Sequence, residues 1–160
     1  IRENAALGLE IQHQKTREAM QELDEMLRNY GLAAFASARP SELSGGMRQR
    51  AALIRTLILK PDLLLLDEPF SALDYQTRLS VCDDIASIIR KTKKTAILIT
   101  HDLAEAISTA DRVLILSARP GQVNAEISLT FAPQYDSPLK RRNAPEFTGY
   151  FQRLYELPVW

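Results

Sequence analysis

Glycine is scarce in this sequence: six glycines occur in 160 residues, about half the usual share of about 7%. No glycine precedes a lysine, so the phosphate-binding pattern G-x-x-x-x-G-K-[ST] is absent, and the pattern G-x-G-x-x-G is absent as well. The printed sequence therefore contains no glycine-rich nucleotide-binding loop of its own.

Three other absences narrow the class of protein. A single cysteine, Cys82, excludes an intrachain disulfide and favours a reducing compartment. The 20 Lys and Arg residues balance the 20 Asp and Glu residues, which argues against a general nucleic-acid-binding surface. No apolar run reaches the ~18 residues of a membrane-spanning helix. Because the sequence starts Ile1-Arg2-Glu3-Asn4, with neither a signal peptide nor an initiator Met, we expect it to be an excerpt.

Hydrophobic periodicity predicts an α/β protein. Apolar residues three and four positions apart indicate helices, and short, uniformly apolar runs indicate strands buried on both faces of a parallel sheet. Strand, helix, strand, helix and strand in succession predict a doubly wound sheet. The expected helices cover residues 14–30, 47–59, 75–90, 102–109 and 147–157, the expected strands cover residues 63–66, 96–99, 112–116 and 123–130, and residues 132–145 are expected to form a loop.

Two adjacent carboxylates, Asp67 and Glu68, follow the apolar run at residues 63–66. Ligands of open α/β sheets gather beyond the carboxyl ends of the strands. There, one carboxylate can bind Mg²⁺ and the next can orient or deprotonate a water molecule. In the alternative interpretation, these residues only terminate the strand with polar, turn-forming side chains. His101 ends the next apolar strand and, if the two strands are neighbours, lies level with the carboxylates; taken alone, it is more often a structural histidine.

Ser44, Gly45 and Gly46 open the helix expected at residues 47–59. Ser44 is a suitable N-cap, and the two glycines permit a ligand to approach exposed backbone N–H groups closely. The start of a helix also favours an anion such as phosphate. The alternative is a purely structural cap. Asp74 has two similar interpretations, since it either caps the next helix or reaches across an interface towards a neighbour's phosphate site.

Taken together, four segments resemble the motifs of ATP-binding cassette (ABC) ATPases. Residues 43–50 (LSGGMRQR) resemble the signature motif, residues 63–69 (LLLLDEP) the Walker B strand with its catalytic Glu, residues 71–74 (SALD) the D-loop, and residues 100–101 (TH) the H-loop. Each short pattern occurs by chance, but all four in the family's order and spacing do not. Within the family, residues 4–9 (NAALGL), 48–50 (RQR) and 75–78 (YQTR) look most similar to importers of the nitrate, sulfonate and taurine group.

The resemblance implies a role for three residues in hydrolysis. Asp67 would take the Mg²⁺ site, Glu68 would be the general base for the hydrolytic water, and His101 would contact the γ-phosphate of ATP. The cofactors implied are therefore ATP and Mg²⁺.

Other matched residues would act across a dimer interface. Ser44, with the amides of Gly45 and Gly46, would contact the γ-phosphate of an ATP held mainly by the opposite subunit. Asp74 would join the same interface. Met47 departs from the commoner Gln, so no side-chain hydrogen bond to nucleotide is available at that position.

The resemblance also implies a partial P-loop NTPase fold. Residues 1–60 would form the helical subdomain on which a membrane permease docks, residues 61–118 the second half of the ATPase core, and residues 119–160 a C-terminal strand, loop and helix. The Walker A loop and the Q-loop cannot be matched, so we expect the chain alone neither to bind nor to hydrolyse ATP. Its uncovered apolar faces would cause oligomerisation or rearrangement.

The leading hypothesis is the C-terminal part of the ATP-hydrolysing subunit of an ABC import system. Such a subunit forms a homodimer, lies in the cytoplasm against a membrane permease, and has no nucleic-acid partner. A second hypothesis is a natural half-cassette that donates its signature face to ATP held by another chain. A third is a soluble ABC ATPase of DNA repair or translation, which is disfavoured because the sequence has no long inserted arm.

Overall fold

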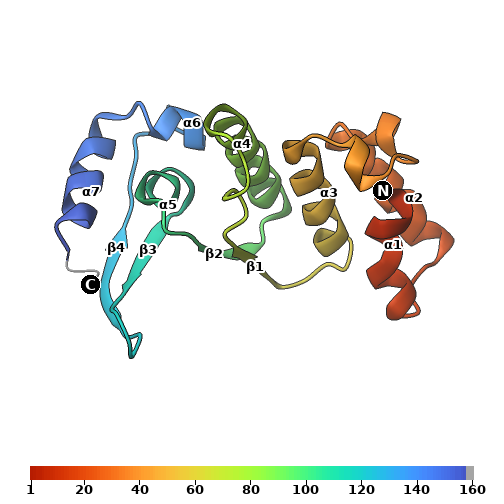
Figure 1. The fold of residues 1–160 in the computed structure, drawn as a ribbon, viewed down its shortest axis with the longest axis horizontal. Coiled ribbons are helices and arrows are strands. Elements are labelled where there is room, and N and C mark those ends of the chain that lie inside the picture. The colour runs from red at the N-terminus through yellow and green to blue at the C-terminus, as the bar shows by residue number, and fades with distance from the viewer. Residues whose placement is uncertain (158–160) are drawn as a thin grey trace.

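The computed structural model describes residues 1–157, which form an elongated α/β molecule (Figure 1). The helices are α1 (Arg2–Ile11), α2 (Arg17–Asn29), α3 (Gly45–Leu57), α4 (Tyr75–Thr92), α5 (Leu103–Thr109), α6 (Pro138–Arg141) and α7 (Pro145–Tyr155), with 3-10 turns η1 (Ala33–Phe35) and η2 (Pro40–Glu42). The strands are β1 (Leu63–Asp67), β2 (Thr95–Ile99), β3 (Arg112–Leu116) and β4 (Val123–Ser128). Every helix and strand predicted from the sequence is therefore present, close to its expected bounds.

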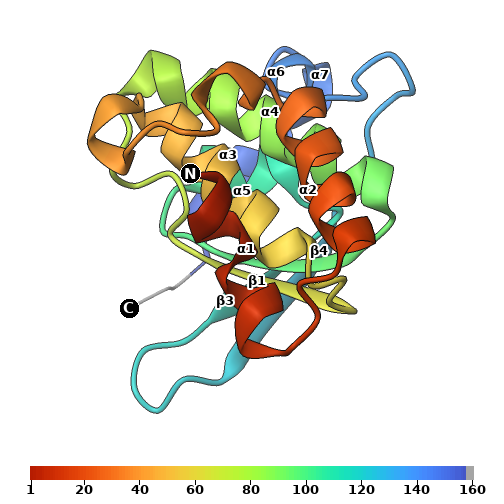
Figure 2. The ribbon, with the colours of Figure 1, turned by 90° about the vertical axis from the view of Figure 1, so that its right-hand side faces the viewer.

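Helices α1, α2 and α3 pack together at one end of the molecule, which faces the viewer in Figure 2. Thr16 caps α2 by accepting a hydrogen bond from the amide of Ala19 at 3.2 Å, and Gly31, with φ of 71°, ends it. The methionines Met20 and Met26 are partly buried and pack against the core of this end, where their flexible side chains suit irregular gaps. That core comprises Ala5, Ala6, Leu9, Leu23, Leu27, Leu32, Ile54 and Ile58.

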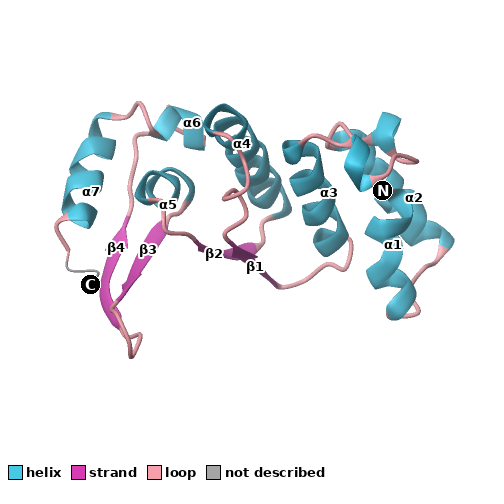
Figure 3. Cartoon of the chain, in the orientation of Figure 1, coloured by secondary structure: helices cyan, strands magenta, loops and turns pink. Residues whose placement is uncertain are grey.

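Strands β1 and β2 form a parallel pair, with Leu63 opposite Thr95 and Asp67 opposite Ile99. Helix α4, which connects them, packs on one face of the pair (Figure 3). The core shared by α3, β1, the loop after β1 and α4 comprises Leu53, Leu57, Leu64, Phe70, Leu73, Val81, Cys82, Ile85 and Ile88. Because parallel strands end at the same edge, the residues that follow β1 and β2 leave the sheet side by side.

The prediction that residues 63–66 are buried on both faces is wrong. Leu64 is fully buried beneath α4, but Leu65 is 70% exposed and, in the neighbouring strand, Ile97 and Ile99 are 49% and 56% exposed. Successive side chains of a strand point to opposite faces, and only one face of this pair is covered by elements of residues 1–157. The other face is apolar and accessible to solvent.

Strand β3 is present, but it pairs with neither β1 nor β2. It is therefore not the third strand of the doubly wound sheet that we expected. It pairs antiparallel with β4, with Arg112 opposite Ser128 and Val113 opposite Ile127, and forms a separate two-stranded sheet. The turn at residues 117–122 brings β4 back along β3, so this local pairing satisfies the backbone of β3. In the same region, α6 interrupts the loop expected at residues 132–145, because Ser137 accepts a hydrogen bond from the amide of Lys140 and caps one helical turn.

Helices α5 and α7 complete the C-terminal end of the described chain. Their core with the second sheet comprises Ile107, Ile115, Ile127, Leu129 and Leu154. The last three residues of the predicted region 119–160 lie outside the described residues. None of the helices in residues 1–157 combines the length and the apolar character needed to cross a membrane.

Candidate functional site

Glu68 and His101 meet at the carboxyl ends of β1 and β2. Nδ1 of His101 lies 2.6 Å from Oε1 of Glu68. The amide of Glu68 donates to the carbonyl of Ile99 at 2.9 Å, which extends the strand pairing by one residue. Glu68 has φ of 45°, in the left-handed region that a residue other than glycine rarely occupies. The chain therefore turns sharply at the carboxylate, and the two side chains expected to lie level are in direct contact.

This contact alters the acid–base chemistry of His101. The hydrogen bond and the negative charge of Glu68, followed by the charges of Asp102 and Glu105, raise the pKa of His101 above its usual value. The side chain of His101 is 80% exposed and that of Glu68 is 37% exposed, so solvent or a ligand reaches both. A protonated imidazole suits a phosphate oxygen, while the second carboxylate oxygen of Glu68 is able to accept a proton.

Asp67 ends β1 beside this pair, and its side chain is exposed. Among residues 1–157, no group of three or more His, Cys, Asp or Glu side chains is arranged to hold a metal ion. Mg²⁺, however, is usually held by one or two carboxylates and completes its shell with waters and substrate phosphates. A single accessible carboxylate beside a predicted phosphate site fits that mode of binding.

Ser44 caps α3, since its Oγ accepts a hydrogen bond from the amide of Met47 at 3.3 Å. The two following glycines are closely packed within the chain. A Cβ atom at Gly45 would lie 2.6 Å from Cδ2 of Leu73, and one at Gly46 would lie 2.6 Å from Cγ2 of Val81. Ser44 therefore acts as the helix cap that the sequence suggested. The contact of this segment with ATP stays a prediction.

Asp74 caps α4, because its Oδ1 accepts a hydrogen bond from the amide of Thr77 at 3.0 Å. Hydrogen bonds from the side chain and the backbone of Thr77 hold the pKa of Asp74 below its usual value. The capping role suggested by the sequence is thus present. The role of Asp74 at an interface stays a prediction.

Three charged residues near the site, Arg78, Asp102 and Glu105, were not singled out from the sequence. Asp102 caps α5 by accepting from the amide of Glu105 at 3.0 Å, and its Oδ2 lies 3.3 Å from a guanidinium nitrogen of Arg78. Burial raises the pKa of Glu105, which is 3% exposed. Arg78 lies one helical turn beyond Asp74, and Asp102 lies next to His101. Their positions beside predicted site residues are the only feature of the sequence that could have pointed to them.

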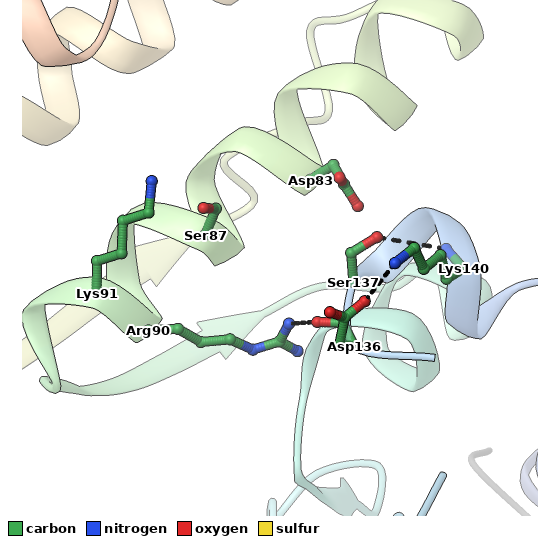
Figure 4. A pocket seen from close by; sticks show the side chains of 7 residues that line it. All are labelled: Asp83, Ser87, Arg90, Lys91, Asp136, Ser137 and Lys140. Atoms are coloured by element: carbon green, nitrogen blue, oxygen red, sulfur yellow. Dashed lines mark hydrogen bonds and ion pairs between the residues drawn. The ribbon is translucent and has the colours of Figure 1, made fainter. Parts of the chain in front are cut away.

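A polar hollow of about 370 Å³ lies elsewhere, between α4 and the segment that leads into α6 (Figure 4). Arg90 donates to the backbone carbonyl of Asp136, and Lys140 contacts the Asp136 carboxylate at 2.8 Å. The bond from Arg90, together with the bond from the amide of Leu139 to Oδ1 of Asp83 at 2.9 Å, holds α4 against the C-terminal segment. None of the residues predicted to act on nucleotide lines this hollow, so it is a structural junction separate from the candidate site.

The chain is similar in sequence to several known proteins. Residues 1–71 match the family model described as "ABC transporter". The chain is 42% identical over 156 residues to an ABC transporter ATP-binding protein of Bacillus subtilis, which covers 98% of the chain. It is also 46% identical to a taurine import ATP-binding protein of Rhizobium johnstonii over 83% of the chain. A nitrate import ATP-binding protein of Synechocystis is 36% identical over 98% of the chain.

The likeness extends to the fold. A solved structure described as an inward-facing conformation of a metal-chelate type ABC transporter superposes on 79% of this chain and 51% of that chain, with a TM-score of 0.65 and 22% sequence identity. The chain spans 60%, 51% and 60% of the lengths of the relatives from Bacillus, Rhizobium and Synechocystis. The chain belongs to the family of ABC transporter ATP-binding proteins.

Proposed function

We propose that this chain supplies the signature motif, the Walker B carboxylates, the D-loop and the H-loop of an ATPase subunit that drives solute import. The observation that carries the proposal is the 2.6 Å contact between Glu68 and His101 at the carboxyl ends of two parallel strands. In α/β sheets this edge is where ligands bind. The contact brings a carboxylate and an imidazole together. The carboxylate can orient and deprotonate a water molecule, and the imidazole can donate a hydrogen bond to a terminal phosphate.

The chemistry assigned to the chain's own residues follows from this contact. The carboxylate of Glu68 orients the attacking water and accepts its proton, while the protonated imidazole of His101 holds Oε1 and offers its other N–H to a phosphate oxygen. Asp67 is the residue that would hold Mg²⁺, which neutralises charge on the phosphates when it is bound. All three groups lie at one edge of the β1–β2 pair.

A second set of residues acts on ATP held by a partner copy. The helix that begins after Ser44 presents its first amides at its positive end, where a phosphate is favoured. Ser44, Gly45 and Gly46 lie at this end, and Leu73, the neighbour of Asp74, packs against Gly45. The signature segment and the D-loop are therefore neighbours within one chain, and both face the partner copy in the proposed homodimer.

The proposed membrane partner is a permease, with the ATPase lying on the cytoplasmic side of the membrane. The helical end formed by α1, α2 and η1 presents apolar side chains to solvent, since Leu7 is 47%, Ile11 69% and Phe35 38% exposed. An exposed apolar surface of this kind suits a protein partner. The names of the taurine, nitrate and sulfonate import relatives support import as the direction of transport.

Isothermal titration with MgATP tests whether ATP is held by residues outside this chain, as the proposal requires. We expect the chain alone to show no specific MgATP binding, because no glycine-rich phosphate loop occurs in its sequence. When the chain is assembled with the portion of the Bacillus relative that it does not span, we expect MgATP binding and hydrolysis. Tight binding of MgATP by the chain alone would contradict the proposal.

The same assembly separates the proposal from a non-catalytic alternative. A half-cassette would lend only its signature face to ATP held by another chain, an idea that the scarcity of glycine favours. In that case Ser44→Ala would reduce hydrolysis and Glu68→Gln would leave it unchanged. The proposal expects both substitutions to reduce hydrolysis.

A further inference from the structure

The side chain of Arg78 joins two loops that flank the candidate site. One guanidinium nitrogen donates to the backbone carbonyl of Leu73 at 3.2 Å. Another donates to Oδ2 of Asp102 at 3.3 Å. Leu73 belongs to the loop after Glu68, and Asp102 directly follows His101. One guanidinium therefore connects the segment that follows the carboxylate with the segment that carries the imidazole.

The surroundings of Arg78 favour a fixed position. Its side chain is 25% exposed and that of Asp102 is 31% exposed, so the ion pair is partly shielded from water. The amide of Arg78 donates to the carbonyl of Asp74 at 2.8 Å, which anchors its backbone in the first turn of α4. A planar guanidinium donates in two directions at once, which a lysine ammonium on a flexible stem does less well.

Each end of this connection is itself held in place. The loop after Glu68 is closed by Ser71, whose Oγ donates to the carbonyl of Glu68 at 2.9 Å. Leu73 is buried and packs on Gly45. On the other side, Asp102 caps α5 and its amide donates to Oγ1 of Thr100 at 3.1 Å. A movement of Arg78 would therefore be transmitted to the backbone on both sides of the contact between Glu68 and His101.

We infer that Arg78 is a positioning residue, which holds the loops at residues 68–74 and 100–102 together and so keeps His101 within hydrogen-bonding distance of Glu68. Its significance for hydrolysis rests on the proposed function. The structural claim does not, because the contact is measurable without ATP.

Two effects of Arg78 on His101 have opposite signs, which makes the inference testable. Arg78 is a positive charge paired with Asp102, the neighbour of His101. A purely electrostatic effect of its removal would favour the protonated imidazole and raise the pKa of His101. Glu68 is the largest cause of the raised pKa of His101, so separation of His101 from Glu68 would lower that pKa. A positioning role and a purely electrostatic role thus move the pKa of His101 in opposite directions.

The experiment is an NMR titration of the histidine ring protons in the purified chain. The sequence has two histidines, so His13, in the turn after α1, provides an internal reference. We expect Arg78→Gln to lower the pKa of His101 towards the value measured in Glu68→Gln. We expect Arg78→Lys to lower it as well, because the charge remains while the two-sided donation is lost. An unchanged or higher pKa of His101 in Arg78→Gln, or a wild-type value in Arg78→Lys, would overturn the inference.

A control variant checks that the expected change in the pKa of His101 is specific to Arg78. Arg112→Gln removes an exposed ion pair with Glu126 of 3.0 Å on the second sheet, and we expect it to leave the pKa of His101 unchanged. If Arg78→Gln does not fold, the result with Arg78→Lys, which retains the long side chain and its charge, decides alone. Absence of ATP hydrolysis in the assembled protein would contradict the proposed function. It would not affect the conclusion about Arg78 drawn from the titration.

Discussion

Nδ1 of His101 lies 2.6 Å from Oε1 of Glu68, although 33 positions separate the two residues in the chain. The parallel register of β1 and β2 makes the contact, since Asp67 is opposite Ile99 and both strands end at the same edge. The sheet therefore brings together a carboxylate and an imidazole that lie far apart in the sequence. The proposed hydrolytic role depends on this contact.

The contact predicts a dependence of stability on pH. Because the pKa of His101 is raised in the folded chain, the contact stabilises the fold fully below the ordinary histidine pKa of about 6.5. The contribution is lost as pH rises through the higher folded value. We expect Glu68→Gln to lower the urea midpoint more at about pH 5.5 than at about pH 9.

Urea unfolding of both proteins at the two pH values measures this difference. His101→Gln is the matched variant, and we expect it to show the same pattern, because it removes the other partner of the contact. Equal losses at both pH values would contradict the assigned charge state of His101.

The packing of Gly46 predicts that adding one methyl group at this position, as in Gly46→Ala, destabilises the packing of α3 on α4. A Cβ there would lie 2.6 Å from Cγ2 of Val81, which is 4% exposed. Overpacking costs about 1–3 kcal/mol, and the better helix propensity of Ala returns at most about 1 kcal/mol. We therefore expect Gly46→Ala to reduce the free energy of unfolding in denaturant titrations.

Gly149 is the matched control, since it lies within α7 and a Cβ there would meet no atom within 4 Å. We expect Gly149→Ala to stabilise the chain by about 0.5–1 kcal/mol. We also expect Val81→Ala to relieve part of the loss caused by Gly46→Ala. Equal effects of the two glycine substitutions would show that the contact with Val81 is unimportant.

Asp74 allows capping to be separated from a role between subunits. Asn is as good an N-cap as Asp, so we expect Asp74→Asn to retain the thermal stability that Asp74→Ala loses. Because the pKa of Asp74 is lowered in the folded chain, its stabilising effect is present above the ordinary value and disappears as pH falls through the folded value. Thermal melts check this order, and equal melting temperatures for the Asn and Ala variants would contradict the capping role.

The open face of β1 and β2 predicts self-association of the chain. Leu65 and Ile97 are opposite one another in the pairing and are 70% and 49% exposed. We expect the double substitution Leu65→Glu with Ile97→Lys to reduce association, because it places a pair of opposite charges on the face. Light scattering measures the mass, and a stable wild-type monomer would contradict this expectation.

Leu64 provides the control for that experiment, because it lies on the opposite, fully buried face of β1. We expect Leu64→Ala to cost about 2–5 kcal/mol of stability. Its effect on association should be absent under conditions in which the variant stays folded. This comparison separates the open face from the stability of the strand itself.

The sequence predicted the strands, the helices other than α1 and α6, and the position of His101 level with Asp67 and Glu68, because each depends on local periodicity and strand direction. An apolar run followed by Asp67 and Glu68, and another followed by Thr100 and His101, are enough to place these side chains at one edge if the strands are parallel neighbours. Helix caps at Ser44 and Asp74 are similarly local. These features depend on interactions within a few residues or on one pairing.

Other features depend on contacts that no local pattern contains. The exposed face of Leu65 depends on which elements cover the sheet, which lie outside β1 in the sequence. The link from Arg78 to Leu73 and Asp102 depends on where two loops lie relative to α4. Such tertiary choices override local preference, so periodicity alone did not indicate them.

The central claim, that Glu68 is the general base for ATP hydrolysis, is tested most directly by the hydrolysis rate of Glu68→Gln in the assembled subunit. MgATP affinity is measured on the same samples, so that a loss of binding is not mistaken for a loss of catalysis. Removal of a general base lowers a rate by about 10²–10⁴-fold, and we expect a loss in this range with unchanged MgATP affinity. A wild-type rate of hydrolysis in Glu68→Gln would contradict the account.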